Sequence, residues 1–235
     1  HTRLSYDMRS AAEHWPASPL PALKRGFITF ACFQNLNKLN EQVLNAWGAI
    51  ARQLPSARWY FQSHQLDLPS SRARLQARLA AAGITETQVE LHGKKEFADY
   101  MQAYQSVDLV LDTFPYPGGT TTLEALWMGV PTLTLLTPGM LGRQGQALLS
   151  AAGMEPDWVC HDAASYISRA TDWAQAERWE DLSHLRLQLR ERVRHSPAFN
   201  TAQFAGDWQA LVREIWVDAC RTRPWDTHDQ HSKLT

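Results

Sequence analysis

A glycine- and threonine-rich turn is the part of this sequence best suited to chemistry. It spans residues 118–122 and follows an apolar run that ends at Leu111, so it joins a buried strand to a helix. Backbone N–H groups and hydroxyls at the start of a helix form a site for phosphate. The candidate phosphate ligands are Gly119, Thr120, Thr121 and Thr122. Glu124, one turn inside the helix, could accept hydrogen bonds from ribose hydroxyls, although a capped helix after a tight turn would have the same composition.

Lys38 is the candidate catalytic residue. It comes a few residues after an expected strand at 27–33, at the edge of the sheet where the glycine-rich turn also lies. An amine there could neutralise a diphosphate, on which negative charge grows as a sugar–phosphate bond breaks. The alternative is a solvated lysine near a helix start. A cation at that position opposes the helix dipole, which favours a functional reason for it.

Three further residues lie in loops that could reach a nucleotide. His92 and Lys94 flank the loop after an expected strand at 89–92, where nucleobases are often contacted by backbone atoms. Arg143 follows the strand expected at 132–136, where it could support a phosphate or a sugar hydroxyl. A structural histidine and an ordinary surface arginine are the alternatives. The chain has no HExxH, GxSxG or P-loop lysine motif, and the absence of GxGxxG argues against a nicotinamide or flavin site.

Strand and helix patterns alternate from Gly26 onward. The expected strands are 27–33, 58–62, 89–92, 109–111 and 132–136. This alternation predicts an α/β fold, a Rossmann-like doubly wound parallel sheet covered by helices. Ligands bind such sheets outside the carboxyl ends of the strands. We therefore expect the loops 34–38, 92–97 and 114–122 to form one nucleotide site.

The last third of the chain predicts a helical C-terminal extension, with helices at 163–176, 180–194 and 201–220. We expect the final helix to bury one apolar stripe, and such a helix could pack against a neighbouring domain. The stripe consists of Phe204, Trp208, Leu211, Ile215 and Trp216. Five tryptophans in helical patterns are interpreted as core or interface anchors. They are Trp47, Trp127, Trp173, Trp208 and Trp216.

Domain organisation follows from the same patterns. The proline-rich residues 1–25 predict a linker or an arm laid on another surface. Residues 26–220 predict the nucleotide-binding domain with its C-terminal helices, and residues 221–235 a loose tail.

Composition limits the class of protein. With 235 residues, of which 44% are hydrophobic and 20% charged, the chain can bury a substantial core. The net charge of −1 gives no overall field for nucleic acid or anionic lipid. Cys32, Cys160 and Cys220 are far apart and form no CxxC pair, which indicates reduced thiols in a cytoplasmic protein and no zinc site. No apolar run is long enough to span a membrane.

Five short segments keep the order and spacing of a known family. They are 35–39 (NLNKL), 111–116 (LDTFPY), 119–124 (GTTTLE), 128–131 (MGVP) and 196–200 (SPAFN). Together they resemble the carboxyl-terminal catalytic half of the O-GlcNAc transferase and SPINDLY-type protein glycosyltransferases, over about 26–216. The resemblance implies a GT-B fold, two Rossmann-like domains with the active site in the cleft. This chain would be the second domain, which binds the nucleotide sugar.

The resemblance also implies an activity: inverting transfer of a sugar, N-acetylglucosamine from UDP-GlcNAc, to Ser or Thr of proteins. Neither a metal nor another cofactor is required in the family. Lys38 matches the lysine that stabilises the diphosphate, Thr120 and Thr121 match the pair that holds it, and Glu124 falls on the ribose contact. The implied partners are a nucleotide sugar, a protein or peptide acceptor, and an N-terminal portion with the first Rossmann domain and tetratricopeptide repeats, which this sequence does not contain.

Two residues depart from the O-GlcNAc transferase pattern. Gly119 stands where a histidine is usual, and Asn35 stands where a glutamine is usual among the donor-binding residues. The turn is closer to the SPINDLY branch, which makes protein O-fucosylation from GDP-fucose the alternative activity. A non-catalytic module that binds a nucleotide or a partner, and an enzyme acting on a small acceptor or an envelope glycan, are further alternatives.

Overall fold

Six parallel strands form the centre of the computed structural model, which describes residues 4–8 and 15–222. Their spatial order is β3 (Val89–His92), β2 (Arg58–Gln62), β1 (Thr29–Cys32), β4 (Leu109–Leu111), β5 (Thr132–Leu135) and β6 (Val159–Cys160). The five predicted strands are confirmed, and so is the Rossmann-like doubly wound sheet. Strand β6 was not predicted, because two residues are too few to show a periodic pattern.

The strand order reverses direction between β1 and β4. The chain builds outward from β1 through β2 to β3 and then returns to place β4 on the other side of β1. Such a point is where open parallel sheets bind ligands, since the loops after the two strands diverge and leave a crevice. Lys38 follows β1 and the glycine-rich turn follows β4, so the sheet topology brings both to this switch point.

Helices cover both faces of the sheet, and every residue of β1, β4 and β5 is buried. The longer helices are α2 (Glu41–Gln53), α3 (Pro69–Ala81), α4 (Phe97–Ala103), α5 (Thr120–Trp127), α7 (Gln144–Ala151), α8 (Ala163–Trp173), α9 (Trp179–Arg194) and α10 (Thr201–Thr222). Two four-residue helices, α1 (Ala22–Arg25) and α6 (Gly139–Gly142), complete them. The sequence predicted no helix for α1, α6 and α7. No helix of the described residues combines the length and apolar character needed to cross a membrane.

Helix α2 illustrates how the sequence sets these elements. The Asn40 side chain accepts a hydrogen bond from the N–H of Val43 over 3.0 Å and so caps the helix N-terminus. Trp47 on its apolar face is fully buried, and its Nε1 donates to the hydroxyl of Tyr166 over 3.2 Å. Since Tyr166 belongs to α8, this bond joins the first helix after β1 to the C-terminal extension.

The described residues before β1, which are 4–8 and 15–28, contact the domain at several points. The N–H of Tyr6 donates to the carbonyl of Ala198 over 3.0 Å, and the N–H of Leu20 donates to the Ser183 hydroxyl over 3.3 Å. Leu20 is buried, which fixes this part of the predicted arm against α9. The predicted domain boundaries themselves stay predictions, and residues 223–235 of the predicted tail lie outside the described residues.

A buried arginine ties α9 to the start of β4. Arg186 is fully buried and donates from Nη1 to the carbonyls of Val107 and Asp108, over 3.0 and 3.1 Å. The Asp108 carboxylate in turn accepts from the N–H groups of Ala22 and Thr29, over 2.9 and 2.7 Å. The arm, the first strand, β4 and α9 therefore share one network of polar contacts.

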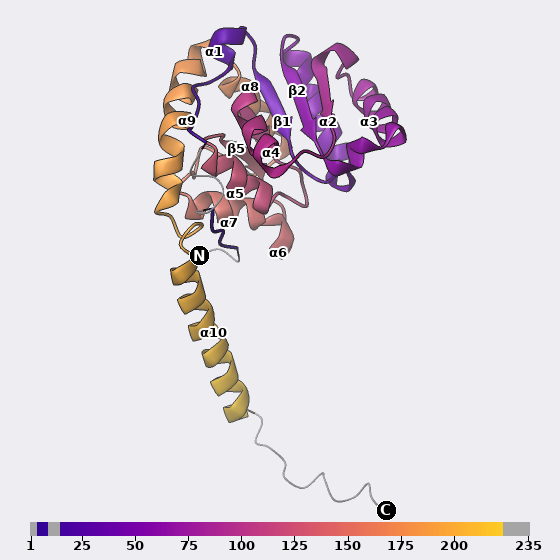
Figure 1. Cartoon of the computed structure of the whole chain (residues 1–235). Coiled ribbons are helices and arrows are strands. Elements are labelled where there is room, and N and C mark those ends of the chain that lie inside the picture. The colour runs from indigo at the N-terminus through magenta and orange to yellow at the C-terminus, as the bar shows by residue number, and fades with distance from the viewer. Residues whose placement is uncertain (1–3, 9–14, 223–235) are drawn as a thin grey trace, which may run out of the picture.

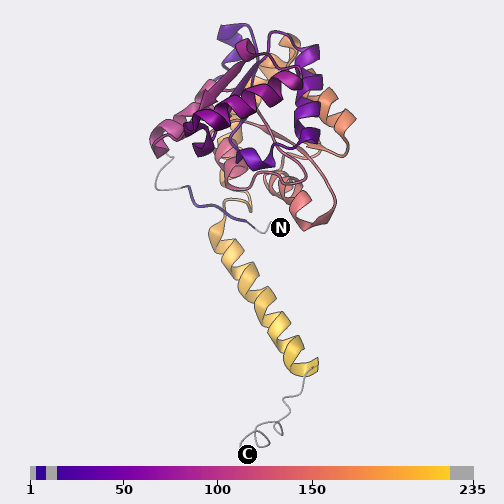
Figure 2. The same cartoon turned by 90° about the vertical axis from the view of Figure 1, so that its right-hand side faces the viewer.

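Helix α10 extends away from the sheet in both views (Figures 1 and 2). None of its residues is buried, and the side chains of Trp208 and Trp216 are 58% and 62% exposed. The predicted burial of this apolar stripe is thus wrong for the described part of the chain, because no described element lies over the helix. The other three tryptophans, Trp47, Trp127 and Trp173, are buried as predicted.

Candidate functional site

Lys38 ends a short 3-10 turn, η1 (Leu36–Lys38), directly after β1. Asn35 caps this turn, since its side chain accepts from the N–H of Asn37 over 2.9 Å. The Nζ of Lys38 donates to Gln34 Oε1 over 2.9 Å and to the Pro117 carbonyl over 3.0 Å. The amine therefore reaches across the switch point to the loop after β4.

A hollow of about 450 Å³ opens beside this amine. Its walls come from the segments after β1 and after β4, and the Lys38 Nζ lies 4.1 Å from the centre of the Tyr116 ring. The lining residues are Asn35, Asn37, Lys38, Asn40, Pro115 and Tyr116. Asn40 also joins the two segments, because its Nδ2 donates to the Phe114 carbonyl over 2.6 Å.

Gln34 connects Lys38 to the threonines. While its Oε1 accepts from the lysine, its Nε2 donates to Thr121 Oγ1 over 2.7 Å. Thr120 and Thr121 form the first turn of α5, whose leading N–H groups have no partner within the helix. Thr120 is exposed and Thr121 half-buried. An amine, the Thr121 hydroxyl and a helix N-terminus are thus linked at one place, a combination that suits a diphosphate.

Asp112 organises the turn that leads to α5. This buried carboxylate accepts from the N–H of Gly118 over 2.7 Å, the N–H of Thr113 over 3.0 Å and the Thr134 hydroxyl over 2.9 Å. Burial raises the pKa of Asp112 to about 6, against the lowering effect of these hydrogen bonds and of Lys38. Burial also lowers the pKa of the Lys38 amine, and the Asp112 carboxylate opposes that shift.

Gly118 allows the turn to approach its neighbours closely. A Cβ atom on this residue would overlap the Gln34 amide and the Thr122 hydroxyl. Its carbonyl accepts from Gln144 Nε2 over 2.7 Å, and Gln144 is buried. A side chain at position 118 would therefore displace the amide that links Lys38 to Thr121.

Glu124 lies in a cluster of tyrosines next to Thr121. Its side chain is almost fully buried and accepts from the hydroxyl of Tyr100 over 2.8 Å and, more weakly, from that of Tyr6 over 3.5 Å. The hydroxyl of Tyr104 donates to the Thr121 carbonyl over 3.3 Å. Burial raises the pKa of the Glu124 carboxyl, and the tyrosine hydroxyls oppose that shift. A carboxylate offers about four acceptor positions, and the tyrosine hydroxyls occupy part of them.

The other predicted site residues, His92, Lys94 and Arg143, do not line the hollow beside Lys38. His92 is the last residue of β3, the edge strand, which β2 separates from β1, and Lys94 lies two residues after it. The His92 ring stacks on Tyr60, with 4.4 Å between ring centres, while Lys94 is exposed. Arg143 is exposed between α6 and α7.

Thr122 is buried within the first turn of α5. Its hydroxyl has no hydrogen-bond partner among residues 4–8 and 15–222.

Gln34 and Asp112 were not among the predicted site residues. Both are buried polar residues at the switch point, where Asp112 directly follows β4 and Gln34 follows β1 after one residue, Phe33. A polar side chain directly after a strand expected from the sequence, 27–33 or 109–111, is the signal that could have found them. Within the described ranges, no group of three or more His, Cys, Asp or Glu side chains is arranged to hold a metal ion.

Comparison with known proteins identifies the family. The profile of glycosyl transferase family 41 matches residues 20–208. This chain belongs to glycosyl transferase family 41. A family-41 relative from Solanum lycopersicum, named probable UDP-N-acetylglucosamine--peptide N-acetylglucosaminyltransferase SPINDLY, is 34% identical over 215 residues. That alignment covers 88% of this family-41 chain and 22% of the relative, so the chain spans about a fifth of such a protein.

Solved structures agree with this assignment. A mutant of the O-GlcNAc transferase from Thermobaculum terrenum superposes with a TM-score of 0.73 at 34% identity, covering 88% of the family-41 chain and 40% of its own. The sucrose-phosphate synthase from Thermosynechococcus elongatus superposes with a TM-score of 0.57 at 14% identity, covering 86% and 50%, and shows the fold alone. The resemblance read from the five sequence segments is confirmed.

Proposed function

We propose that this chain is the donor-binding half of an inverting glycosyltransferase that transfers a sugar from a nucleotide diphosphate to Ser or Thr of proteins. The observation that carries the proposal is the hydrogen-bonded link from Lys38 through Gln34 to Thr121 at the switch point of the sheet. It sets an amine and a helix N-terminus at one place, where a diphosphate gains from both.

Each site residue has a role in this proposal. The sugar–phosphate bond breaks heterolytically, and its electron pair stays on the departing diphosphate. The Lys38 amine and the first N–H groups of α5 stabilise that charge as it grows, which lowers the barrier more than equal binding of the ground state would. Thr120 and Thr121 hold the phosphates by their hydroxyls, and Glu124 accepts from ribose. Asp112 and Gln34 position these groups without touching the donor.

The acceptor hydroxyl must lose a proton as it attacks from the opposite face of the sugar. We assign that general base to a portion of the enzyme outside this chain, together with the tetratricopeptide repeats that would hold the protein acceptor. The relatives' length supports this division, since the chain spans 22% of the Solanum lycopersicum protein. A cytoplasmic location and independence from a metal belong to the same proposal.

UDP-N-acetylglucosamine is the proposed donor. Its support is the activity given in the names of the SPINDLY relatives and of the O-GlcNAc transferase that superposes on this chain. GDP-fucose is the alternative donor, favoured by Gly119 in place of the histidine of the O-GlcNAc transferase pattern. In either case His92, Lys94 and Arg143 are proposed to act on the outer parts of the nucleotide or sugar.

A non-catalytic binding module is the second candidate function. The site itself suits this function as well, because the Lys38 amine and the start of α5 can bind a diphosphate whether or not a sugar is then transferred. Transfer assays with the chain alone, and then with a supplied N-terminal half of a family-41 enzyme, separate the two functions. Transfer that appears only with the added half supports the donor-binding role.

The experiment that tests the proposal is donor binding by this chain. The unfolding temperature should rise with millimolar UDP, UDP-N-acetylglucosamine, GDP or GDP-fucose. A larger rise with the two uridine nucleotides, or with the two guanosine nucleotides, identifies the nucleobase that the site prefers. Lys38→Ala should reduce the shift, and Arg52→Gln, an exposed arginine on the far end of α2, should leave it unchanged. If none of the four nucleotides raises the unfolding temperature, the proposed function is wrong.

A further inference from the structure

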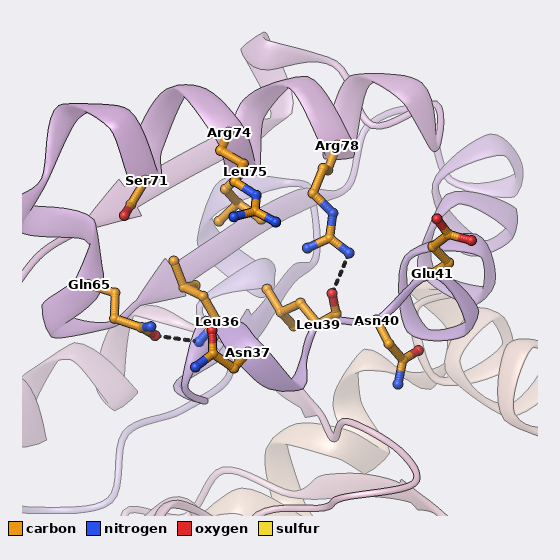
Figure 3. A pocket seen from close by; sticks show the side chains of 10 residues that line it. All are labelled: Leu36, Asn37, Leu39, Asn40, Glu41, Gln65, Ser71, Arg74, Leu75 and Arg78. Atoms are coloured by element: carbon orange, nitrogen blue, oxygen red, sulfur yellow. Dashed lines mark hydrogen bonds between the residues drawn. The ribbon is translucent and has the colours of Figure 1, made fainter.

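A second hollow, of about 460 Å³, lies between η1 and α3 (Figure 3). It is lined by Leu36, Asn37, Leu39, Asn40, Glu41, Gln65, Ser71, Arg74, Leu75 and Arg78. Arg74 and Arg78 are one helical turn apart, and their guanidinium groups both extend from α3 toward η1. With Glu41 as the single acidic residue of the lining, the wall carries a net positive charge.

The two arginines differ in how they are held. Arg78 is half-buried, and its Nη2 donates to the Leu39 carbonyl over 2.5 Å, which fixes one guanidinium at the edge of the hollow. Arg74 is exposed, and its guanidinium forms no hydrogen bond or ion pair with any residue in 4–8 or 15–222. In Figure 3, Arg78 lies between Arg74 and Glu41, and Arg74 lines the hollow without an acidic residue beside it.

Neutral donors complete this wall. The Asn37 amide and the Ser71 hydroxyl line the same space as Arg74. The Gln65 carbonyl oxygen already accepts from the N–H of Leu36 over 2.7 Å, which leaves its amide N–H groups as donors. Guanidinium, amide and hydroxyl donors around one space recognise a carboxylate or a phosphate, and a guanidinium can bind either through two parallel hydrogen bonds.

This hollow adjoins the one beside Lys38. Asn37 and Asn40 line both, and the three residues of η1 separate them. An extended peptide advances about 3.3 Å per residue, so an acceptor whose hydroxyl lies near Lys38 needs only a few residues to cross η1. The nucleotide is already provided for on the α5 side of Lys38, which leaves the acceptor as the molecule in reach of Arg74.

We propose that Arg74, with Arg78, forms a subsite for a carboxylate side chain of the protein acceptor, and that acceptors with Asp or Glu near the modified Ser or Thr are preferred. This inference rests on the proposed function, because it assigns the second hollow to the acceptor of that reaction. Its chemistry involves binding alone, with no bond formed or broken.

The test is equilibrium binding of two fluorescein-labelled peptides to the full chain, followed by fluorescence anisotropy. One peptide has two glutamates on each side of a central Ser-Thr pair, and the other has glutamines at those positions. The glutamate peptide should bind about ten-fold more tightly, as a charge-assisted hydrogen bond predicts, and the difference should shrink at 0.5 M salt. Arg74→Gln should abolish the difference, Arg74→Glu should invert it, and the matched control Arg52→Gln should retain it.

Two results would overturn the inference. Equal binding of the two peptides by the unsubstituted chain is one. The other is displacement of the glutamate peptide by UDP or GDP, which would make the arginines part of the nucleotide site. Because the thermal shift with nucleotides is measured on the same samples, failure of the acceptor subsite and failure of donor binding are told apart. Arg74→Gln should leave that nucleotide shift unchanged.

Discussion

The amine of Lys38 and the hydroxyl of Thr121 are bonded to the two ends of one carboxamide, that of Gln34. The distances are 2.9 Å on the lysine side and 2.7 Å on the threonine side. Lys38 follows β1 and Thr121 begins α5, so the bond pair spans the switch point of the sheet. The groups proposed to meet a diphosphate are thereby oriented before a ligand binds, which reduces the reorganisation that binding and catalysis require.

Replacing Lys38 with alanine should lower the rate of sugar transfer by about 10²- to 10³-fold, because the charge on the departing diphosphate loses its nearest cation. The free energy of unfolding should change by less than about 1 kcal/mol, since the amine is only half-buried beside an open hollow. Initial rates at saturating donor, measured with a supplied N-terminal half of a family-41 enzyme, and urea unfolding of the chain measure the two effects. Lys38→Arg, which keeps the charge, should retain more activity than Lys38→Ala. Parallel losses of rate and stability would mean that the residue is structural.

Gln34→Ala should weaken nucleotide binding by about ten-fold, although the residue is not expected to touch the nucleotide. The reason is that Lys38 and Thr121 each lose a partner and no longer hold a fixed separation. Isothermal calorimetry with UDP measures the effect. Gln53→Ala, which removes an exposed glutamine from α2, is the control and should bind as the unsubstituted chain does. Unchanged affinity in Gln34→Ala would show that the link is dispensable.

The affinity for a nucleotide sugar should fall as the pH drops through about 6. Asp112 has a pKa raised to about 6 by burial, so above that pH it accepts from Gly118, Thr113 and Thr134, and below it the protonated carboxyl gives up one of these bonds. Calorimetry with UDP-N-acetylglucosamine from pH 5 to 7.5 measures this, because its diphosphate has no proton to gain in that range. Asp112→Asn should flatten the dependence, and the exposed Asp157→Asn should not.

The ionisation of Asp112 affects the free energy of unfolding in the opposite direction: it lowers stability as the pH rises, whereas nucleotide affinity should rise. Since the pKa in the folded state lies above the ordinary value of 3.8, Asp112 holds a proton between about pH 4 and 6 that the unfolded chain releases. Its contribution to the free energy of unfolding is therefore greatest at low pH and declines as the pH rises through 6. Asp108, whose pKa is also raised to about 6 by burial, contributes in the same direction. Because two carboxyls contribute to the pH dependence of stability, the pH dependence of nucleotide affinity is the more specific test of the ionisation of Asp112.

Glu124→Gln should remove most of the preference for a ribose with free hydroxyls. The unsubstituted chain should bind UDP about ten-fold more tightly than 2′,3′-dideoxy-UDP, as hydrogen bonds to a carboxylate predict. Tyr6→Phe removes only a long bond of 3.5 Å to Glu124 and serves as the control that keeps the preference. If Glu124→Gln retains the full discrimination, the carboxylate serves the tyrosine cluster and not the ribose.

Two tryptophans should differ sharply in their effect on stability. Trp47→Ala should lower the free energy of unfolding by about 3–5 kcal/mol, because the ring is fully buried and bonded to Tyr166. Trp216→Ala should change it by less than about 0.5 kcal/mol, since that side chain is 62% exposed on α10. Urea unfolding followed by circular dichroism measures both. A loss at Trp216 comparable with that at Trp47 would contradict the exposed position of α10.

Five of the strands and the doubly wound sheet could be predicted from the sequence, because apolar runs and glycine-rich turns alternate with clear periodicity. Lys38 and Thr121 were brought together by topology alone: parallel strands carry their following loops to one edge. Gln34 could not be assigned in this way. Whether its carboxamide faces the sheet, the solvent or two loops at once depends on the rotation of β1, which a four-residue strand does not reveal.

The sequence also did not reveal which elements far apart along the chain contact each other. The apolar stripe of α10 has the spacing of a buried helix face, and periodicity alone does not tell whether anything in the same chain covers it. Arg74 is the opposite case, a residue with no distinctive sequence pattern that nevertheless lines a hollow. As one arginine in a polar helix it carries no motif, and only the placement of η1 beneath α3 makes it part of a hollow.

The contacts of Arg186 and Asp108 define which parts of the chain should melt together. Removing α9 would leave the carbonyls of Val107 and Asp108 without their donor inside the protein, so the segment before β1, the central strands and α9 should lose structure in one step. Helix α10 has no share in that cooperative unit. Its amide hydrogens should exchange with solvent long before those of α9, and the chain could lose all 22 of its residues with little change in how firmly the sheet is held.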